Sequence, residues 1–276
     1  MMQKTSFANE SLWVKRAGIL ITLGFLAVFI VLPLYTIFSE AFRSGVAVYK
    51  KAVTSPEVLS SIRLTLTVAL VCVPINTIFG TLLAWSIAKY SFRGKKALTT
   101  LIELPFAVSP VIAGLMFVLL FGAHGGLGRW LQSMDIKIVF ALPGIILATT
   151  FVTFPFIART LIPLMESLGN DDEEAALTLG ASGLQTFFKI TLSNIKWGLL
   201  YGIILTNARA IGEYGAVAVV SGLIRGETTT LPLTIGFLFD EYAFSAAFAA
   251  ASLLTLLAFV TLILKSAMER RLKASD

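Results

Sequence analysis

Six long apolar runs divide this sequence, and five of them carry no charged side chain. The runs are residues 17–38, 64–88, 104–123, 138–158, 197–224 and 242–264. A helix needs about 20 predominantly apolar residues to cross the hydrocarbon core of a bilayer, and each run is long enough. We therefore expect an all-α, polytopic membrane protein with six transmembrane helices.

The composition also indicates a membrane protein. Charged residues make up 14% of the chain, far below the roughly 25% of soluble domains. Residues 1–16 are polar and end in Lys15-Arg16, directly before the first apolar run. A secretory signal peptide also has a basic start followed by an apolar core. The first run, residues 17–38, is longer than the roughly 7–15 apolar residues of a signal core, so we expect it to remain as a span.

Lysine and arginine are divided unequally between the two sides that six spans would create. The side that includes both termini carries 14 of these residues and the other side carries 7. Because positive charge favours the cytoplasmic side, residues 1–16, 166–193 and the tail 265–276 are expected in the cytoplasm. The basic residues are scattered and form no patch typical of nucleic-acid binding.

Residues 166–193, between the fourth and fifth runs, are polar and have a helical pattern of their own. Asn170 is a suitable N-cap residue. Four carboxylates follow it at 171–174, where they would complement the positive end of a helix dipole. A short helix is therefore predicted to begin at Asp171.

The rest of this segment predicts a turn and a second helix. Ala175, Ala176 and Leu179 are spaced to form one apolar face. Gly180 can adopt a left-handed conformation and stop the helix, after which Ser182 can cap another. A compact helix-turn-helix is expected.

The order Glu174-Ala175-Ala176, three residues, Gly180, nine residues and Ile190 resembles the EAA loop of the permease subunits of bacterial ABC importers. Ser193 stands where that family usually has proline. The resemblance implies a coupling helix that docks on a cytoplasmic ATPase subunit. Its contact residues would be Glu174, Ala175, Ala176, Leu179, Gly180 and Ile190.

Two opposite charges interrupt the fifth run. Arg209 and Glu213 are four residues apart and share a helix face. An isolated arginine at the bilayer centre costs at least roughly 2.5–3.5 kcal/mol, so it needs a partner or a watery cavity. Either Arg209 faces a translocation path for an anion while Glu213 orients it, or the two only neutralise each other. Asn207 is a further candidate for the path, or a hydrogen-bond donor between helices.

Two further stretches narrow the resemblance. Residues 208–216 resemble a signature shared by permeases for sulfate, thiosulfate and molybdate. Residues 221–233 look like the outer loop of the W-type subunit of sulfate and thiosulfate importers. In such a loop Arg225, Thr228 and Thr230 could meet a tetrahedral oxyanion, although they could equally seat a binding protein or end a helix.

Catalytic and metal chemistry are not indicated. The sequence has no phosphate-binding loop of the G-x-x-x-x-G-K-[ST] type, so ATP and its magnesium would be bound by a partner ATPase. One cysteine and one histidine cannot form a cysteine or histidine metal cluster. We expect a transport subunit that is not itself an enzyme and has no cofactor.

The resemblance implies a permease core over residues 64–264, preceded by the first span, in the inner membrane of a bacterium. Its implied partners are a second homologous permease subunit, two ATPase subunits and a periplasmic sulfate-binding protein. The implied cargo is sulfate or thiosulfate. Molybdate or another tetrahedral oxyanion is an alternative, and an autonomous secondary anion transporter is an alternative of a different class.

Overall fold

The structure is a computed structural model that describes residues 12–273, and all regular secondary structure in this range is helical. In chain order the elements are α1 (Leu12–Leu26), the π-helical η1 (Ala27–Val31), α2 (Leu32–Phe42), α3 (Val46–Val53), α4 (Pro56–Lys89), α5 (Lys95–Ala107), α6 (Pro110–Phe121), α7 (Gly126–Gln132), α8 (Leu142–Thr153), α9 (Pro155–Leu168), α10 (Asp171–Thr178), α11 (Gly183–Thr186), the π-helical η2 (Phe187–Thr191), α12 (Leu192–Ile211), α13 (Gly215–Val220), α14 (Leu231–Asp240) and α15 (Phe244–Lys273).

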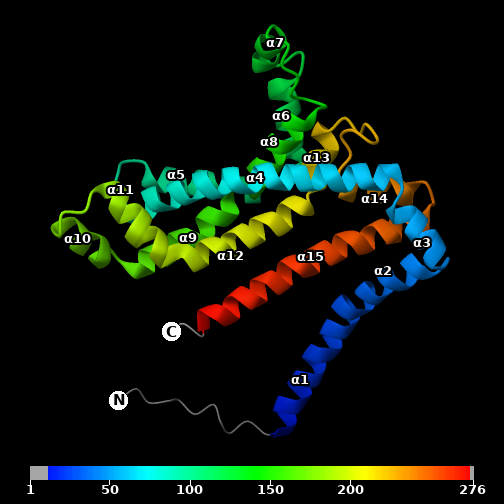
Figure 1. The fold of residues 1–276 in the computed structure, drawn as a ribbon, viewed down its shortest axis with the longest axis horizontal. Helices are drawn as coiled ribbons and strands as arrows, with labels where there is room; N and C mark the ends of the chain where they lie inside the picture. The colour runs from blue at the N-terminus through cyan, green and yellow to red at the C-terminus, as the bar shows by residue number, and fades with distance from the viewer. Residues whose placement is uncertain (1–11, 274–276) are drawn as a thin grey trace.

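The longest helix, α4, forms the axis of the bundle. Its 34 residues correspond to a length of about 50 Å. It packs against α8, α9, α12 and α14, while α15 packs against α2, α12 and α14. In Figure 1, α10 and α11 lie at one end of α4, and α3 and α14 lie at the other.

Four helices are long and apolar enough to cross a membrane, within the described range. They are Trp13–Phe42, Pro56–Lys89, Leu142–Leu168 and Phe244–Ile263. They correspond to the first, second, fourth and sixth predicted runs. The helix Trp13–Phe42 extends away from the bundle in Figure 1, and its α2 portion packs against α15.

The third predicted run, residues 104–123, is not one continuous helix. The chain bends by 106° between α5 and α6. Ser109 has φ −58° and ψ 136°, the extended conformation that a following proline favours. The described residues therefore contain five spans only if this bent pair is counted as one.

The fifth predicted run, residues 197–224, is also broken. Its helix α12 begins earlier than expected, at Leu192, and ends at Ile211. The chain becomes helical again only at Gly215, where α13 begins. A single continuous span here was therefore a wrong expectation, and the total of six spans stays a prediction.

Small residues allow the helices to pack closely around α4. A Cβ atom added at Gly80 would lie 2.7 Å from the Cβ of Ile157 on α9. The neighbouring cluster of Ala84, Leu161 and Ile195 joins α4, α9 and α12. Close packing of this kind is a main source of helix association in membranes, where lipid tails are as apolar as the side chains.

A buried amide supports the break between α8 and α9. Pro155 has no backbone N–H, so the helix cannot continue unchanged through Phe154. Asn76 of α4 is fully buried and donates to the Thr150 carbonyl at 3.2 Å and to Thr153 Oγ1 at 2.7 Å. Asn76 therefore provides partners for polar groups beside the break.

We expect Asn76→Leu to lower the free energy of unfolding by about 1–3 kcal/mol, because buried polar groups on α8 lose their partner. Unfolding of the purified protein in detergent would measure this. Thr77→Val is a matched control, since the Thr77 hydroxyl donates to the Val73 carbonyl of its own helix, at 2.7 Å. Equal stability of the two variants would contradict the role given to Asn76.

Candidate translocation site and coupling segment

The third and fifth apolar runs contact each other where each is interrupted, at the starts of α6 and α13. A Cβ atom added at Gly215, the first residue of α13, would lie 3.0 Å from the Cβ of Pro110, the first residue of α6. Farther along, a Cβ added at Gly114 would lie 2.6 Å from the carbonyl oxygen of Ala216. The helices α6 and α13 therefore start side by side and pack backbone to backbone.

Arg209, in the last turn of α12, and Glu213, between α12 and α13, form an ion pair beside this contact of α6 and α13. Arg209 Nη1 is 2.6 Å from Glu213 Oε2. The other carboxylate oxygen of Glu213 accepts a hydrogen bond from the Ala216 backbone N–H at 2.9 Å. One carboxylate thus neutralises the arginine and pairs a free N–H at the start of α13.

The two charges differ in exposure. The Glu213 side chain is 1% exposed, whereas that of Arg209 is 32% exposed. A guanidinium has five N–H donors, so the partly exposed face of Arg209 can still accept an anion. The structure shows that Arg209 and Glu213 pair with each other. The other interpretation of the sequence, in which Arg209 faces a translocation path, stays a prediction.

Asn207 lies two residues earlier on α12 and is half-buried. The predicted hydrogen bond from its amide to another helix is not formed within the described part of the chain. Its place in a translocation path therefore also stays a prediction.

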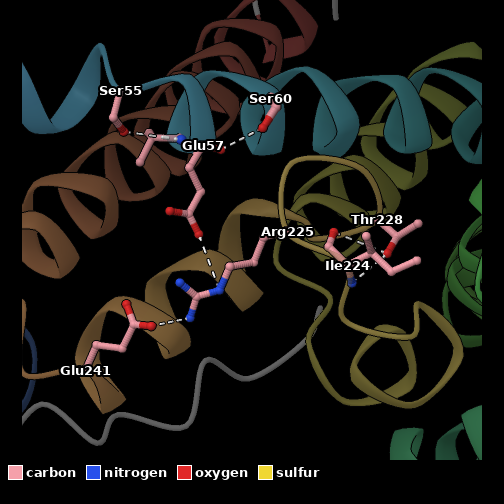
Figure 2. A network of polar contacts seen from close by, with 8 residues as sticks. Ser55, Glu57, Ser60, Ile224, Arg225, Thr228 and Glu241 are labelled. Carbon is pink, nitrogen blue, oxygen red and sulfur yellow. Dashed lines mark hydrogen bonds and ion pairs between the residues drawn. The ribbon is translucent and has the colours of Figure 1, made fainter.

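Arg225 lies between the carboxylates of Glu57 and Glu241, as Figure 2 shows. Glu57 is in the first turn of α4, and α10 lies at the other end of this helix in Figure 1. Arg225 Nε is 3.9 Å from Glu57 Oε1, and Arg225 Nη2 donates to Glu241 Oε1. The guanidinium carbon also lies 5.0 Å from the ring centroid of Phe237. The hydrogen bond to Glu241 raises the pKa of Arg225 above its ordinary value, so the side chain stays charged.

The threonines predicted beside Arg225 are buried. Thr228 is 6% exposed and Thr230 is 4% exposed. The Thr228 hydroxyl accepts from the Ile224 N–H at 3.0 Å and so closes the loop (Figure 2). Farther along, Leu231 N donates to Thr65 of α4 at 2.8 Å. Thr65 therefore holds the end of the loop to α4, and contact of Thr228 and Thr230 with an oxyanion stays a prediction.

The helix-turn-helix of residues 166–193 is confirmed in its main features. Helix α10 begins at Asp171, and Gly180 has φ +89°. Ser182 and Gln185 form a capping box at the start of α11. Asn170 lies at the predicted N-cap position, and its carbonyl accepts from Glu174 N at 2.9 Å. Its side chain makes no capping hydrogen bond, because its φ of −120° and ψ of −1° do not give the extended backbone of a usual N-cap.

The predicted coupling residues lie largely on the surface of this segment. Glu174, Ala175 and Gly180 are exposed, and Leu179 is 88% exposed. Ala176 and Ile190, which complete the set, are half-buried. The segment therefore presents an acidic and apolar surface that nothing else in the described chain covers.

Sequence reasoning missed the contacts of two acidic residues in this segment. Glu173 Oε1 is 3.0 Å from Lys89 Nζ, and Asp172 Oδ2 accepts from Asn194 Nδ2 at 2.8 Å. No local pattern points to these partners, because they lie on α4 and α12. The acidic first turn was expected only to complement the helix dipole.

Residues 76–274 match the family model of the binding-protein-dependent transport system inner membrane component. The chain is 50% identical over 259 residues to the sulfate transport system permease protein CysW of Escherichia coli (strain K12). That alignment covers 93% of this chain and 89% of the relative. The chain belongs to this permease family.

Other permeases agree with this assignment. The CysW protein of Synechocystis sp. is 49% identical, with 94% of both chains covered. The sulfate transport system permease protein CysT of Escherichia coli (strain K12) is 36% identical, with 86% of this chain and 87% of the relative covered.

Solved structures show the same fold. A bacterial ABC transporter for import of the acidic polysaccharide alginate superposes with a TM-score of 0.80 at 21% identity, over 94% of this chain and 96% of that chain. The alginate transporter in complex with its periplasmic protein gives a TM-score of 0.79 at 21% identity, over 94% of this chain and 95% of that chain. The permease fold is therefore retained at low sequence identity.

Gly114→Ala is expected to destabilise the permease by about 1–3 kcal/mol, because the added methyl group meets the Ala216 carbonyl oxygen and the backbones of α6 and α13 must separate. Thermal unfolding in detergent would measure the change. Gly126→Ala is the control, since nothing lies within 4 Å of a Cβ there. A Gly114→Ala variant as stable as this control would show that the close approach is not required.

Proposed function

We propose that this chain is the membrane-spanning subunit of an ATP-driven importer that moves sulfate or thiosulfate into the cytoplasm. The observation that carries the proposal is its 50% identity, over 93% of its length, to a sulfate transport system permease. The resemblances of residues 208–216 and 221–233 point to the same cargo.

The proposed assembly contains two different permease subunits. This chain is 50% identical to CysW and 36% identical to CysT, and both relatives are sulfate permeases. A homologous second subunit, two ATPase subunits and a periplasmic sulfate-binding protein would complete the importer. In the proposed topology, six spans cross the bacterial inner membrane and both termini are cytoplasmic.

Two features of the fold support this function. Ala175 of α10 and Leu179, directly after this helix, are exposed at one end of α4, where a cytoplasmic ATPase could bind. The breaks at Ser109 and at residues 212–214 meet beside Arg209. In membrane transporters, broken helices are tolerated where they line a cavity or a path.

Arg209 is the proposed anion contact of that path. Glu213 neutralises its charge while the permease is unloaded, at a distance of 2.6 Å. A passing sulfate could hydrogen-bond the exposed face of the guanidinium without breaking this pair. The arginine would lower the barrier for a dianion, and the carboxylate would prevent the anion from being held tightly.

Proteoliposomes that contain the complete importer should accumulate labelled sulfate only when ATP and the binding protein are present. Liposomes containing this chain alone should not, because it lacks a phosphate-binding loop. Uptake by the chain alone under an ion gradient would instead support a secondary transporter. Stronger competition by molybdate than by unlabelled sulfate would reassign the cargo.

Arg209→Gln should lower the rate of sulfate uptake by roughly tenfold or more, because a charge-assisted hydrogen bond is worth about 1.5–3 kcal/mol. Arg209→Lys keeps the charge and should retain more of the rate. Uptake by the complete importer would be measured at equal ATPase content. If the double variant Arg209→Leu/Glu213→Leu transports at the normal rate, the pair is structural only.

A further inference from the structure

Another ion pair, Lys89–Glu173, joins the coupling segment to α4, the main axis of the bundle. Lys89 is the last residue of α4, and Glu173 lies in the first turn of α10. Lys89 Nζ is 3.0 Å from Glu173 Oε1, and it also donates to the Gly169 carbonyl, just after the end of α9. One ammonium group thus contacts both sides of the turn between α9 and α10.

The same carboxylate is bound from the other side of the segment. Thr191, the last residue of η2, donates its hydroxyl to Glu173 Oε1 at 3.0 Å. In the next turn, Asn194 of α12 donates to Asp172 at 2.8 Å. The first turn of α10 is therefore attached by side chains to α4 and to α12.

Three aromatic residues line the same pocket as this ion pair. Trp85 of α4 packs edge-on against Tyr90 and Phe187, with centroid distances of 5.2 and 5.0 Å. The side chains of Lys89 and Glu173 are only 9% and 16% exposed. An ion pair with little solvent contact is screened weakly, and loss of one partner leaves an uncompensated charge.

A nearby ion pair differs in these respects. Lys95 Nζ is 3.8 Å from Glu166 Oε1, and the two side chains are 37% and 51% exposed. Solvent-exposed pairs of this kind contribute little. It therefore serves as a matched comparison in the same part of the fold.

We propose that the Lys89–Glu173 pair is the joint through which a displacement of α10 reaches the transmembrane helices. The inference rests on the proposed function, in which an ATPase moves α10. Helix α10 has only eight residues and is mostly exposed, so its own packing can transmit little force. The pair connects it to α4, which continues for 34 residues to the opposite end of the bundle. Lys89 and Glu173 act here as positioning residues and do not contact the cargo.

The test uses the complete importer in proteoliposomes. ATP hydrolysis is measured with and without sulfate-loaded binding protein, and sulfate uptake is measured in parallel. Glu173→Gln removes the charge and keeps an oxygen acceptor for Thr191, while Lys89→Met keeps the length of the side chain. Each should reduce the stimulation of hydrolysis by the loaded binding protein at least about fivefold. Lys95→Met should leave it unchanged.

The double variant Lys89→Met/Glu173→Gln should be no worse than either single variant, because both remove the same interaction. Copurification of the ATPase in normal amount would show that assembly is intact. Wild-type stimulation in both single variants, or additive losses in the double variant, would overturn the inference.

A crosslink separates this inference from the proposed function. Ala175→Cys should crosslink to the ATPase in the wild-type and Glu173→Gln backgrounds alike, and the native Cys72 is buried. If the crosslink forms and both charge variants remain fully coupled, only the role proposed for the Lys89–Glu173 pair is wrong. If no crosslink forms in the wild-type background, the proposed function is wrong, and so is the role of the pair that rests on it.

Discussion

The need to pair every backbone polar group inside a bilayer governs this structure. Within the described residues, the chain interrupts its apolar helices at Ser109, at Phe154 and at residues 212–214. Each interruption frees N–H or C=O groups that lipid cannot satisfy. At the second break Asn76 donates to a carbonyl, and at the third Glu213 accepts a backbone N–H. At these two breaks, buried polar side chains thus supply partners for backbone groups where regular helical hydrogen bonding stops.

Local chemistry made part of the fold predictable from sequence. The start of α10 follows from four acidic residues, and its end follows from Gly180, because helix ends depend on a few neighbouring residues. Pro110 indicates an interruption within the third run, because proline cannot continue a helix unchanged. The break within the fifth run was missed, because a long apolar run predicts a span without showing its continuity, and the glycines flanking Glu213 were the available signal.

The partners of the buried polar groups could not be predicted in the same way. Asn76 and Thr150 belong to different helices, as do Lys89 and Glu173. Periodicity identifies the apolar faces of each helix but does not say which helices meet. The ion pair of Arg209 and Glu213 could be predicted from the sequence, because both residues lie on one helical face and an unpaired arginine is costly in a membrane. Its position beside a second broken helix required the structure.

The two ends of α4 are held by ion pairs of different strength. At one end Lys89 and Glu173 are nearly buried, whereas at the other Arg225 and Glu57 are 45% and 31% exposed and 3.9 Å apart. Water and salt screen the exposed pair, so its separation costs little. Separation of the buried pair leaves charges without solvent or partner. In the proposed importer, the nearly buried pair would therefore pass a displacement of α10 to α4, whereas the exposed pair between Arg225 and Glu57 would resist movement little.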